Sequence, residues 1–170
     1  EETGAAVNIK GLAGKATSSI TFAKDVAGGS SDEMTLGLDD VGTPAKGSAD
    51  PTFANIKMAG IEDVTLNVSG DNYANLSGLS AAETFTIGGT GDLTVNEVAQ
   101  SVETVDAVKA AGDLNLDLSK AVDFQNATLG SGNDNLVISN LEETSEIDGG
   151  KGDDTVTFDG VGGRYQPVLT

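Results

Sequence analysis

Two glycine-rich turns in this chain carry residues that could bind a metal ion. They read Gly130-Ser-Gly132-Asn-Asp134 and Gly149-Gly150-Lys-Gly152-Asp-Asp154, and a large apolar residue follows two positions after each aspartate. Glycine permits backbone conformations in which carbonyl oxygens can point toward a cation, and the aspartates add carboxylates. Calcium takes about six to eight oxygen ligands of these two kinds, and one turn supplies about half of them. We therefore expect calcium between the turns of Asp134 and Asp154.

Other acidic residues are weaker candidates for the same chemistry. Asp148 precedes the second turn, Asp153 lies within it, and both are expected to be accessory ligands. Asp92 and Asp113 each follow a glycine but keep only part of the motif. A purely structural role is an open alternative for these two, because Gly and Asp both suit tight turns. The predicted metal-binding residues are Gly130, Gly132, Asp134, Gly150, Gly152, Asp154, Asp148, Asp153, Asp92 and Asp113.

The two turns belong to a repeat with a period of about 20 residues. Its glycines, each followed by Asp or Asn, are Gly70, Gly91, Gly112, Gly132 and Gly152. Before the first three of these glycines lie the stretches 62–66, 83–87 and 103–107, in which polar and apolar residues alternate. Such alternation predicts half-buried strands, and a fixed period is typical of stacked units that share one core. The sequence therefore predicts an all-β fold, a parallel β-helix or β-roll solenoid with coils of about 20 residues.

The repeat divides the chain into three predicted parts. Residues 61–160 are expected to form the coils, with calcium-binding turns at 130–154, and 161–170 a C-terminal tail. Residues 1–60 contain alternating stretches but no measurable period, so early coils with a long insertion at 39–52 and a small β subdomain are both open. Residues 72–79 and 98–109 are each expected to contribute a helical turn.

Composition argues against several classes of function. The chain has 27 acidic and 9 basic residues, a formal charge of -18, and neither Cys nor His. Without His and Cys the usual acid–base, nucleophilic and zinc chemistries lack their residues, so no enzyme is expected. The negative charge disfavours nucleic acid and anionic lipid as partners. No apolar run reaches the roughly 18 residues of a membrane helix, so direct membrane insertion is not expected.

The turn motif, preceded by degenerate coils, resembles the RTX family, the calcium-binding nonapeptide β-roll proteins that bacteria export by type I secretion. The mixture of degenerate coils and true motif turns is most similar to the RTX-type surface-layer (S-layer) proteins of Gram-negative bacteria. This resemblance implies a secreted structural protein on the bacterial cell surface that uses calcium for folding and self-associates in a surface lattice. A repeat segment of a type I secreted RTX adhesin and a noncatalytic RTX module of a secreted enzyme are the alternatives.

Overall fold

The computed structural model describes residues 5–22, 27–44, 46, 49–141 and 144–159, together with the backbone of residues 168 and 169. Within these residues the chain forms fifteen strands and no helix. The strands are β1 (Ala5–Lys10), β2 (Thr17–Ile20), β3 (Glu33–Asp39), β4 (Ala54–Met58), β5 (Asp63–Ser69), β6 (Asp71–Leu79), β7 (Thr84–Gly89), β8 (Asp92–Val98), β9 (Thr104–Ala110), β10 (Leu114–Leu118), β11 (Asn126–Thr128), β12 (Asn135–Ile138), β13 (Glu146–Asp148), β14 (Thr155–Phe158) and β15 (Val168–Leu169).

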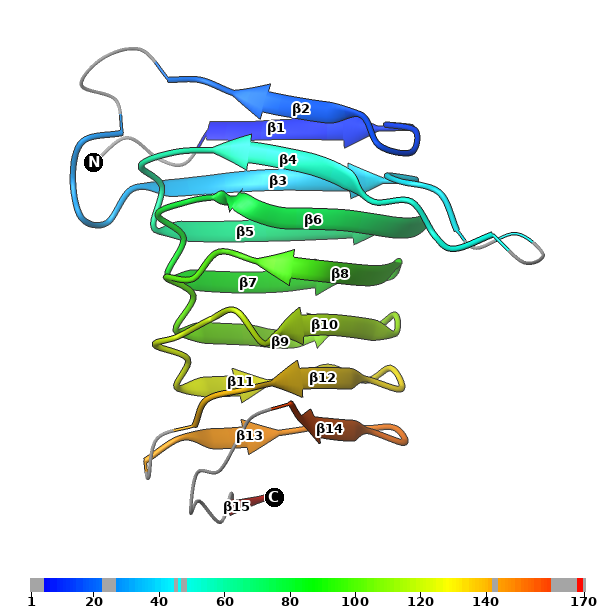
Figure 1. The fold of residues 1–170 in the computed structure, drawn as a ribbon, viewed down its shortest axis with the longest axis vertical. Coiled ribbons are helices and arrows are strands. Elements are labelled where there is room, and N and C mark those ends of the chain that lie inside the picture. The colour runs from blue at the N-terminus through cyan, green and yellow to red at the C-terminus, as the bar shows by residue number, and fades with distance from the viewer. Residues whose placement is uncertain are drawn as a thin grey trace.

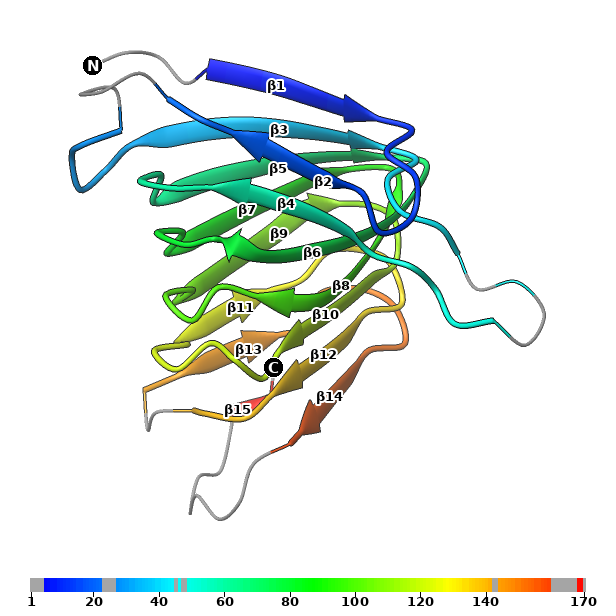
Figure 2. The same cartoon turned by 45° about the horizontal axis from the view of Figure 1, so that its top comes forward.

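Successive strands alternate between two sheets (Figure 1). The odd-numbered strands form one sheet in the order β1-β3-β5-β7-β9-β11-β13-β15, and the even-numbered strands form the other in the order β14-β12-β10-β8-β6-β4-β2. All neighbouring strands are parallel. The chain thus runs out along one sheet, turns, returns along the other and advances by one strand, as Figure 2 shows. The predicted all-β fold with parallel strands is confirmed.

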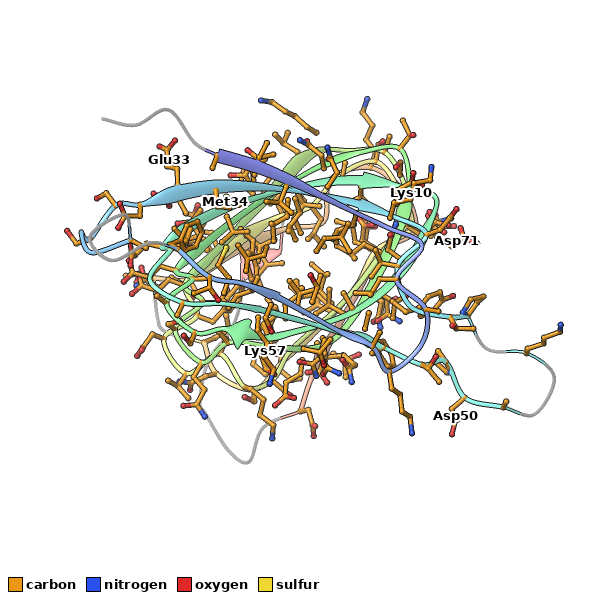
Figure 3. All side chains as sticks on the ribbon, turned by 90° about the horizontal axis from the view of Figure 1, so that it is seen from above. Lys10, Glu33, Met34, Asp50, Lys57 and Asp71 are labelled. Carbon is orange, nitrogen blue, oxygen red and sulfur yellow. The ribbon has the colours of Figure 1, made fainter. Side chains whose placement is uncertain are left out.

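Alternating side chains explain why these segments become strands. In β5 the apolar residues Val64, Leu66 and Val68 are buried, whereas the polar residues between them are more exposed. Side chains on a strand point to opposite faces in turn, so each strand contributes one row to the space between the sheets. In Figure 3, Met34 points into that space and its neighbour Glu33 points away from it. The apolar rows of both sheets form one continuous core.

The first four strands belong to the same two sheets as the later ones. β1 pairs with β3, and β2 pairs with β4, which pairs in turn with β6. The turn between β3 and β4 is enlarged by a short excursion with antiparallel bridges at Thr43–Thr52 and Lys46–Ala49. Residues 45, 47 and 48 of this excursion lie outside the described residues. The expected insertion at 39–52 therefore extends from the stack without interrupting either sheet.

The expected helical turns at 72–79 and 98–109 are wrong. The first segment lies in β6, where Ala74, Leu76 and Leu79 are buried against the core. The second half of the second segment lies in β9, and Val98 ends β8. Register shifts add a residue to β6 against β4 and to β9 against β7, and they accommodate the irregular apolar spacing that suggested helix, because a bulge adds a residue without ending the strand.

Two further sequence predictions concern the C-terminal segment and membrane-spanning helices. Of the predicted tail at 161–170, only the backbone of β15 is described, and it pairs with β13. None of the described residues forms a helix long and apolar enough to cross a membrane.

Candidate metal-binding turns

The turns that lead from odd to even strands stack along one edge of the fold and present two columns of equivalent residues. We call the exposed one the outer column, and it consists of Asp40, Asp71, Asp92, Asp113, Asn133 and Asp153. The next residue of each turn faces the core. This inner column consists of Val41, Asn72, Leu93, Leu114, Asp134 and Asp154.

Outer-column side chains link one turn to the next. The Oδ1 atom of Asp92 accepts the backbone N–H of Asp113 at 2.8 Å, and Oδ1 of Asp113 accepts that of Asn133 at 2.7 Å. The same contact joins Asn133 to the amide of Asp153 at 3.0 Å. A hydrogen bond from an amide to a carboxylate is stronger than one between neutral groups. Asp92 and Asp113, both predicted as metal ligands, therefore each use one oxygen to hold successive turns together.

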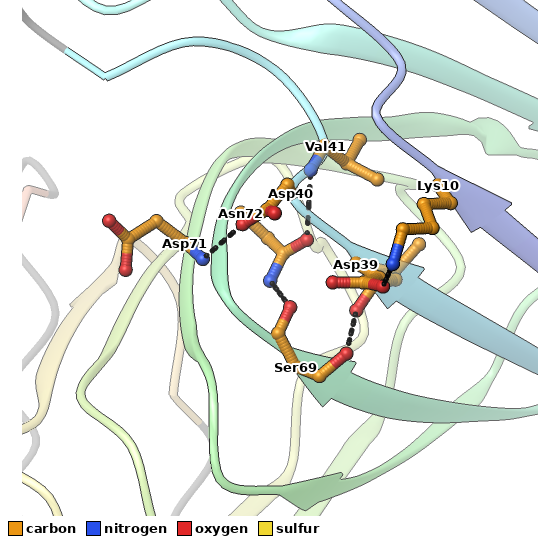
Figure 4. A network of polar contacts seen from close by, with 8 residues as sticks. Lys10, Asp39, Asp40, Val41, Ser69, Asp71 and Asn72 are labelled. Carbon is orange, nitrogen blue, oxygen red and sulfur yellow. Dashed lines mark hydrogen bonds and ion pairs between the residues drawn. The ribbon is translucent and has the colours of Figure 1, made fainter.

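The inner column places Asn72 in a fully hydrogen-bonded, buried position (Figure 4). Its Oδ1 accepts the N–H of Val41 at 3.1 Å. Its Nδ2 donates to the carbonyl oxygens of Ser69 at 2.9 Å, Gly70 at 3.2 Å and Asp92 at 3.2 Å. Because Asn72 is only 1% exposed, these bonds replace all of its contact with water. The amide group fills this turn and binds three carbonyl oxygens from two adjacent turns.

Asp134 takes the equivalent position in a later turn. It is 2% exposed, with Oδ1 accepting the N–H of Leu114 at 2.8 Å and Oδ2 that of Gly130 at 3.2 Å. Burial raises the pKa of Asp134, and the charges of Asp154 and Asp113 raise it further. The hydrogen bonds from the backbone N–H groups of Leu114 and Gly130 act in the opposite direction. A buried carboxylate whose pKa is raised lacks a compensating positive charge nearby.

Asp154 lies one turn further along the stack. Its Oδ1 accepts the N–H of Asp134 at 2.9 Å, whereas Oδ2 has no hydrogen bond among the described residues. Asp148 lies at the start of the same turn, and its Oδ1 accepts the N–H of Gly150 at 2.9 Å. Asp153 is exposed in the outer column. Asp134 and Asp154 are thus in direct contact, with Asp148 and Asp153 at the periphery of their turn.

The glycines of the motif allow the two turns to approach closely. Gly150 and Gly152 have φ angles of 82° and 126°, which side chains with a Cβ rarely adopt. A Cβ on Gly150 would collide with the carbonyl oxygen of Gly130, and a Cβ on Gly152 with that of Gly132. The carbonyl oxygens of one turn therefore lie directly against the backbone of the next.

These turns bring together carbonyl oxygens and two carboxylates, but not a cluster of carboxylates. No group of three or more acidic side chains that could hold a metal ion occurs among the described residues. A cation in these turns would need carbonyl oxygens of Gly130 and Gly132 in addition to Asp134 and Asp154. Calcium accepts such a mixed set, whereas zinc prefers nitrogen and sulfur ligands.

Asn72 is the site residue that sequence reasoning missed. The signal was present, because Gly70-Asp71-Asn72, Gly132-Asn133-Asp134 and Gly152-Asp153-Asp154 all read Gly-Asx-Asx. Where the turn contains Leu93 or Leu114 in the third place, the inner position is apolar instead. The pattern separates turns with a polar interior from turns with an apolar one.

Comparison of the chain with known proteins adds no family to this description. No protein-family model, no curated protein and no solved structure matches it.

Proposed function

We propose that this chain is a structural, calcium-dependent module of a secreted bacterial surface-layer protein. In this proposal the two parallel sheets form a β-roll solenoid with coils of about 20 residues. Calcium binds between the turns of Asp134 and Asp154 and stabilises the end of the roll. The module has no catalytic role and contributes to self-association in a surface lattice.

The contact between Asp134 and Asp154 is the observation that carries the proposal. The 2.9 Å bond from the Asp134 amide to Oδ1 of Asp154 holds two acidic turns one coil apart, while Oδ2 of Asp154 has no hydrogen bond among the described residues. Each carboxylate oxygen of Asp134 accepts a hydrogen bond from a backbone N–H group. Each oxygen also has a further lone pair that could bind a cation. A cation here relieves the repulsion between two carboxylates of which one is buried.

Asn72 supports the same assignment from another coil. Its Nδ2, a positively polarised donor, binds three carbonyl oxygens of two adjacent turns. Asp134 occupies the equivalent place but has no such donor to offer. A bound calcium ion would supply the positive charge to the carbonyl oxygens around Asp134 that the amide supplies around Asn72.

The lattice part of the proposal rests on the outer column and the net charge. Five of its six residues are aspartates, all exposed along one edge of the stack. In a protein with a charge of -18 this edge repels a like edge unless cations intervene. Divalent calcium can bridge such surfaces, whereas magnesium keeps its water and does so poorly.

Thermal unfolding with millimolar calcium and with a chelator tests the proposal. Calcium at 100 times its dissociation constant should add about 2.7 kcal/mol to the free energy of unfolding. For a domain of this size that is roughly a 5–11 °C rise in melting temperature. Asp134→Ala and Asp154→Ala should abolish calorimetric calcium binding, and Asp71→Ala, from the outer column, should retain it. An unchanged melting temperature, or equal losses in all three variants, contradicts the proposal.

The lattice requires a separate measurement. Light scattering and electron microscopy should show sheets of the parent protein in calcium and few in magnesium at equal concentration. A parent protein that stays dispersed in millimolar calcium contradicts the surface-layer assignment and leaves the calcium site standing.

A further inference from the structure

The turns that follow β6, β8 and β10 lie along the edge of the stack opposite to the two columns (Figure 2). Beside them is a hollow of about 400 Å³, within the range of about 300–1,000 Å³ that is usual for small-molecule sites. Its polar lining consists of Ser77, Ser80, Glu97, Gln100, Ser101 and Lys120. None of these residues belongs to the proposed calcium site, which lies at the other edge.

Two register shifts shape this hollow. β6 has one residue more than β4 in the interval that contains Ser77, and β8 has one residue more than β6 in the interval that contains Glu97. A bulge changes the direction of the side chains beside it and is common next to binding sites. Both shifts lie where these two side chains line the hollow.

The side-chain amide of Asn75 holds Ser77 and Glu97 in place. Its Nδ2 donates to Oε2 of Glu97 at 3.2 Å, and its Oδ1 accepts the hydroxyl of Ser77 at 2.6 Å and the backbone N–H of Ser77 at 3.1 Å. Glu97 is partly buried, and its other oxygen, Oε1, has no hydrogen bond among the described residues. Because strand residues fix this carboxylate, Oε1 is a preorganised acceptor.

The three turns beside the hollow have the same shape. In each, the backbone N–H of the fourth residue donates to the carbonyl oxygen of the first, at 3.0, 3.4 and 3.0 Å. Ser80 and Gln100 occupy the second position of their turns, and Ser101 and Lys120 the third. The hydroxyl of Ser101 donates to the carbonyl oxygen of Ala82 at 2.8 Å, whereas the other three side chains have no hydrogen bond or ion pair among the described residues.

The polar groups around the hollow differ in charge and in hydrogen-bonding type. Glu97 only accepts and Lys120 only donates, whereas the hydroxyl of Ser80 and the amide of Gln100 do both. In the part of the chain that the structure describes, no ion pair joins Glu97 to Lys120, so both charges are available to a ligand. With one charge of each sign the hollow selects neither anions nor cations, and the net charge of -18 disfavours anions further.

The remaining lining is apolar. Val98 and Ala99, which are 2% and 4% exposed, form what we call the apolar floor of the hollow. Small-molecule sites combine such a surface with a few polar groups that fix the orientation of the ligand. A sugar ring has the complementary character, because its C–H groups pack on an apolar surface and its neighbouring hydroxyls each donate and accept.

We propose that this hollow binds one neutral hexose unit. Oε1 of Glu97 accepts a hydrogen bond from one ring hydroxyl, and the ammonium group of Lys120 donates to another. Ser80 and Gln100 bind further hydroxyls, and the ring packs on the apolar floor. The site needs no metal ion and is independent of the calcium proposal.

NMR titration of the isotope-labelled chain tests the class of ligand. Glucose, galactose and mannose are added as free hexoses and as methyl glycosides, and at least one should shift the backbone amides of Ser80, Gln100 and Ser101. Binding of a methyl glycoside assigns a unit of a glycan, and binding of the free hexose alone assigns a soluble sugar. Glucuronate, glycine and methylamine, as anion, zwitterion and cation, should bind at least roughly tenfold more weakly. No shift with any hexose, or tighter binding of a charged ligand, overturns the proposal.

Two matched pairs of variants test the residues. Glu97→Gln keeps the size of the side chain but removes the charged acceptor, and Glu33→Gln makes the same change on the other sheet, where Glu33 points away from the core (Figure 3). Lys120→Met removes the ammonium group, and Lys109→Met does so at an exposed position of β9. Glu97→Gln and Lys120→Met should each raise the dissociation constant at least roughly tenfold, about 1.4 kcal/mol, and the controls should not change it. Equal affinities within either pair overturn the proposal.

All titrations are made with calcium present, so that the two proposals are tested separately. A chain that calcium stabilises but that binds no hexose contradicts only the sugar site. A chain that binds hexose but melts at the same temperature with and without calcium contradicts only the proposed function.

Discussion

Replacing Asn72 with aspartate tests what the inner column contributes. Asn72→Asp exchanges one NH2 group for an oxygen with almost no change in shape. In the native turn Nδ2 donates to three carbonyl oxygens at 2.9, 3.2 and 3.2 Å. The new carboxylate oxygen would face the same three acceptors with no hydrogen between them, in a position that is 1% exposed. The substitution therefore converts three attractive contacts into repulsive ones.

The size of the effect follows from these contacts. Each lost hydrogen bond between neutral groups contributes about 0.5–1.5 kcal/mol net, and each buried carbonyl left unpaired costs more. Nδ2 has two hydrogens, so one of them is shared between two of the three carbonyl oxygens, and about two hydrogen bonds are lost. With a charge brought into a buried position as well, this predicts a fall of about 3–5 kcal/mol in the free energy of unfolding without calcium. At roughly 2–4 °C per kcal/mol, the melting temperature should fall by about 6–20 °C.

Urea unfolding in the presence of a chelator is the assay, with Asn96→Asp as the control. Asn96 lies exposed on β8, in the next coil, and its replacement makes the same change in charge. A substitution at such a surface position should change stability by at most about 0.5 kcal/mol. If the two variants lose equal stability, the hydrogen bonds from Nδ2 of Asn72 do not stabilise the turn.

A calcium arm extends the same experiment. The new carboxylate would make the turn of Asn72 similar to the turn of Asp134, so added calcium should restore part of the stability of Asn72→Asp and none of that of Asn96→Asp. A large loss of stability that calcium does not restore would support the role of the Asn72 hydrogen bonds. It would contradict the analogy between the side-chain amide of Asn72 and a bound cation.

Two further predictions concern the turns of the motif. Gly152→Ala should lower the free energy of unfolding. The unfavourable φ of 126° alone costs about 1–3 kcal/mol, and a collision of the new Cβ with the carbonyl oxygen of Gly132 adds to this cost. Gly28→Ala, where a Cβ meets nothing within 4 Å, should be neutral in the same urea unfolding experiment. For pH, burial raises the pKa of Asp134 above its ordinary 3.8, so the folded state holds this proton more tightly than the unfolded state. The measured quantity is the free energy of unfolding of the wild type minus that of Asp134→Asn, in the presence of a chelator. This difference should be highest below about pH 3.8 and fall as pH rises through the raised pKa of Asp134. A difference that rises with pH over this range contradicts a raised pKa for Asp134.

The strands were predictable because two local signals agree at most positions. Around Leu93, Leu114 and Leu136, alternation gives the buried face and the glycine of each turn gives the boundary. The period predicts which strands pair, and Leu93 indeed lies beside Leu114, as Leu116 lies beside Leu136. Local pattern and global register coincide in a repeat, so few alternatives compete.

The prediction failed where pairing overrides the local pattern. In the segment around Ala74 and Leu76 the apolar spacing changes within one strand, and only the neighbouring strands show that a register shift absorbs the change. The role of Asn72 was missed for a related reason. Whether an Asx residue in a turn faces water or the core depends on its column, and the columns become visible only once the turns are stacked.

The hydrogen bonds of the two columns also give the stack a direction. In the outer column, a side-chain oxygen accepts an amide of the following turn, as from Asp92 to Asp113. Asp134 and Asp154 do the reverse in the inner column, since each accepts an amide from the preceding turn, Leu114 and Asp134 respectively. The outer column therefore ends with Asp153, whose carboxylate has no following amide among the described residues, while an oxygen of Asp154 has no partner there either. Among the described residues, carboxylate oxygens without a hydrogen-bond donor are thus found in the turn of Asp153 and Asp154, where a cation would be strongly attracted.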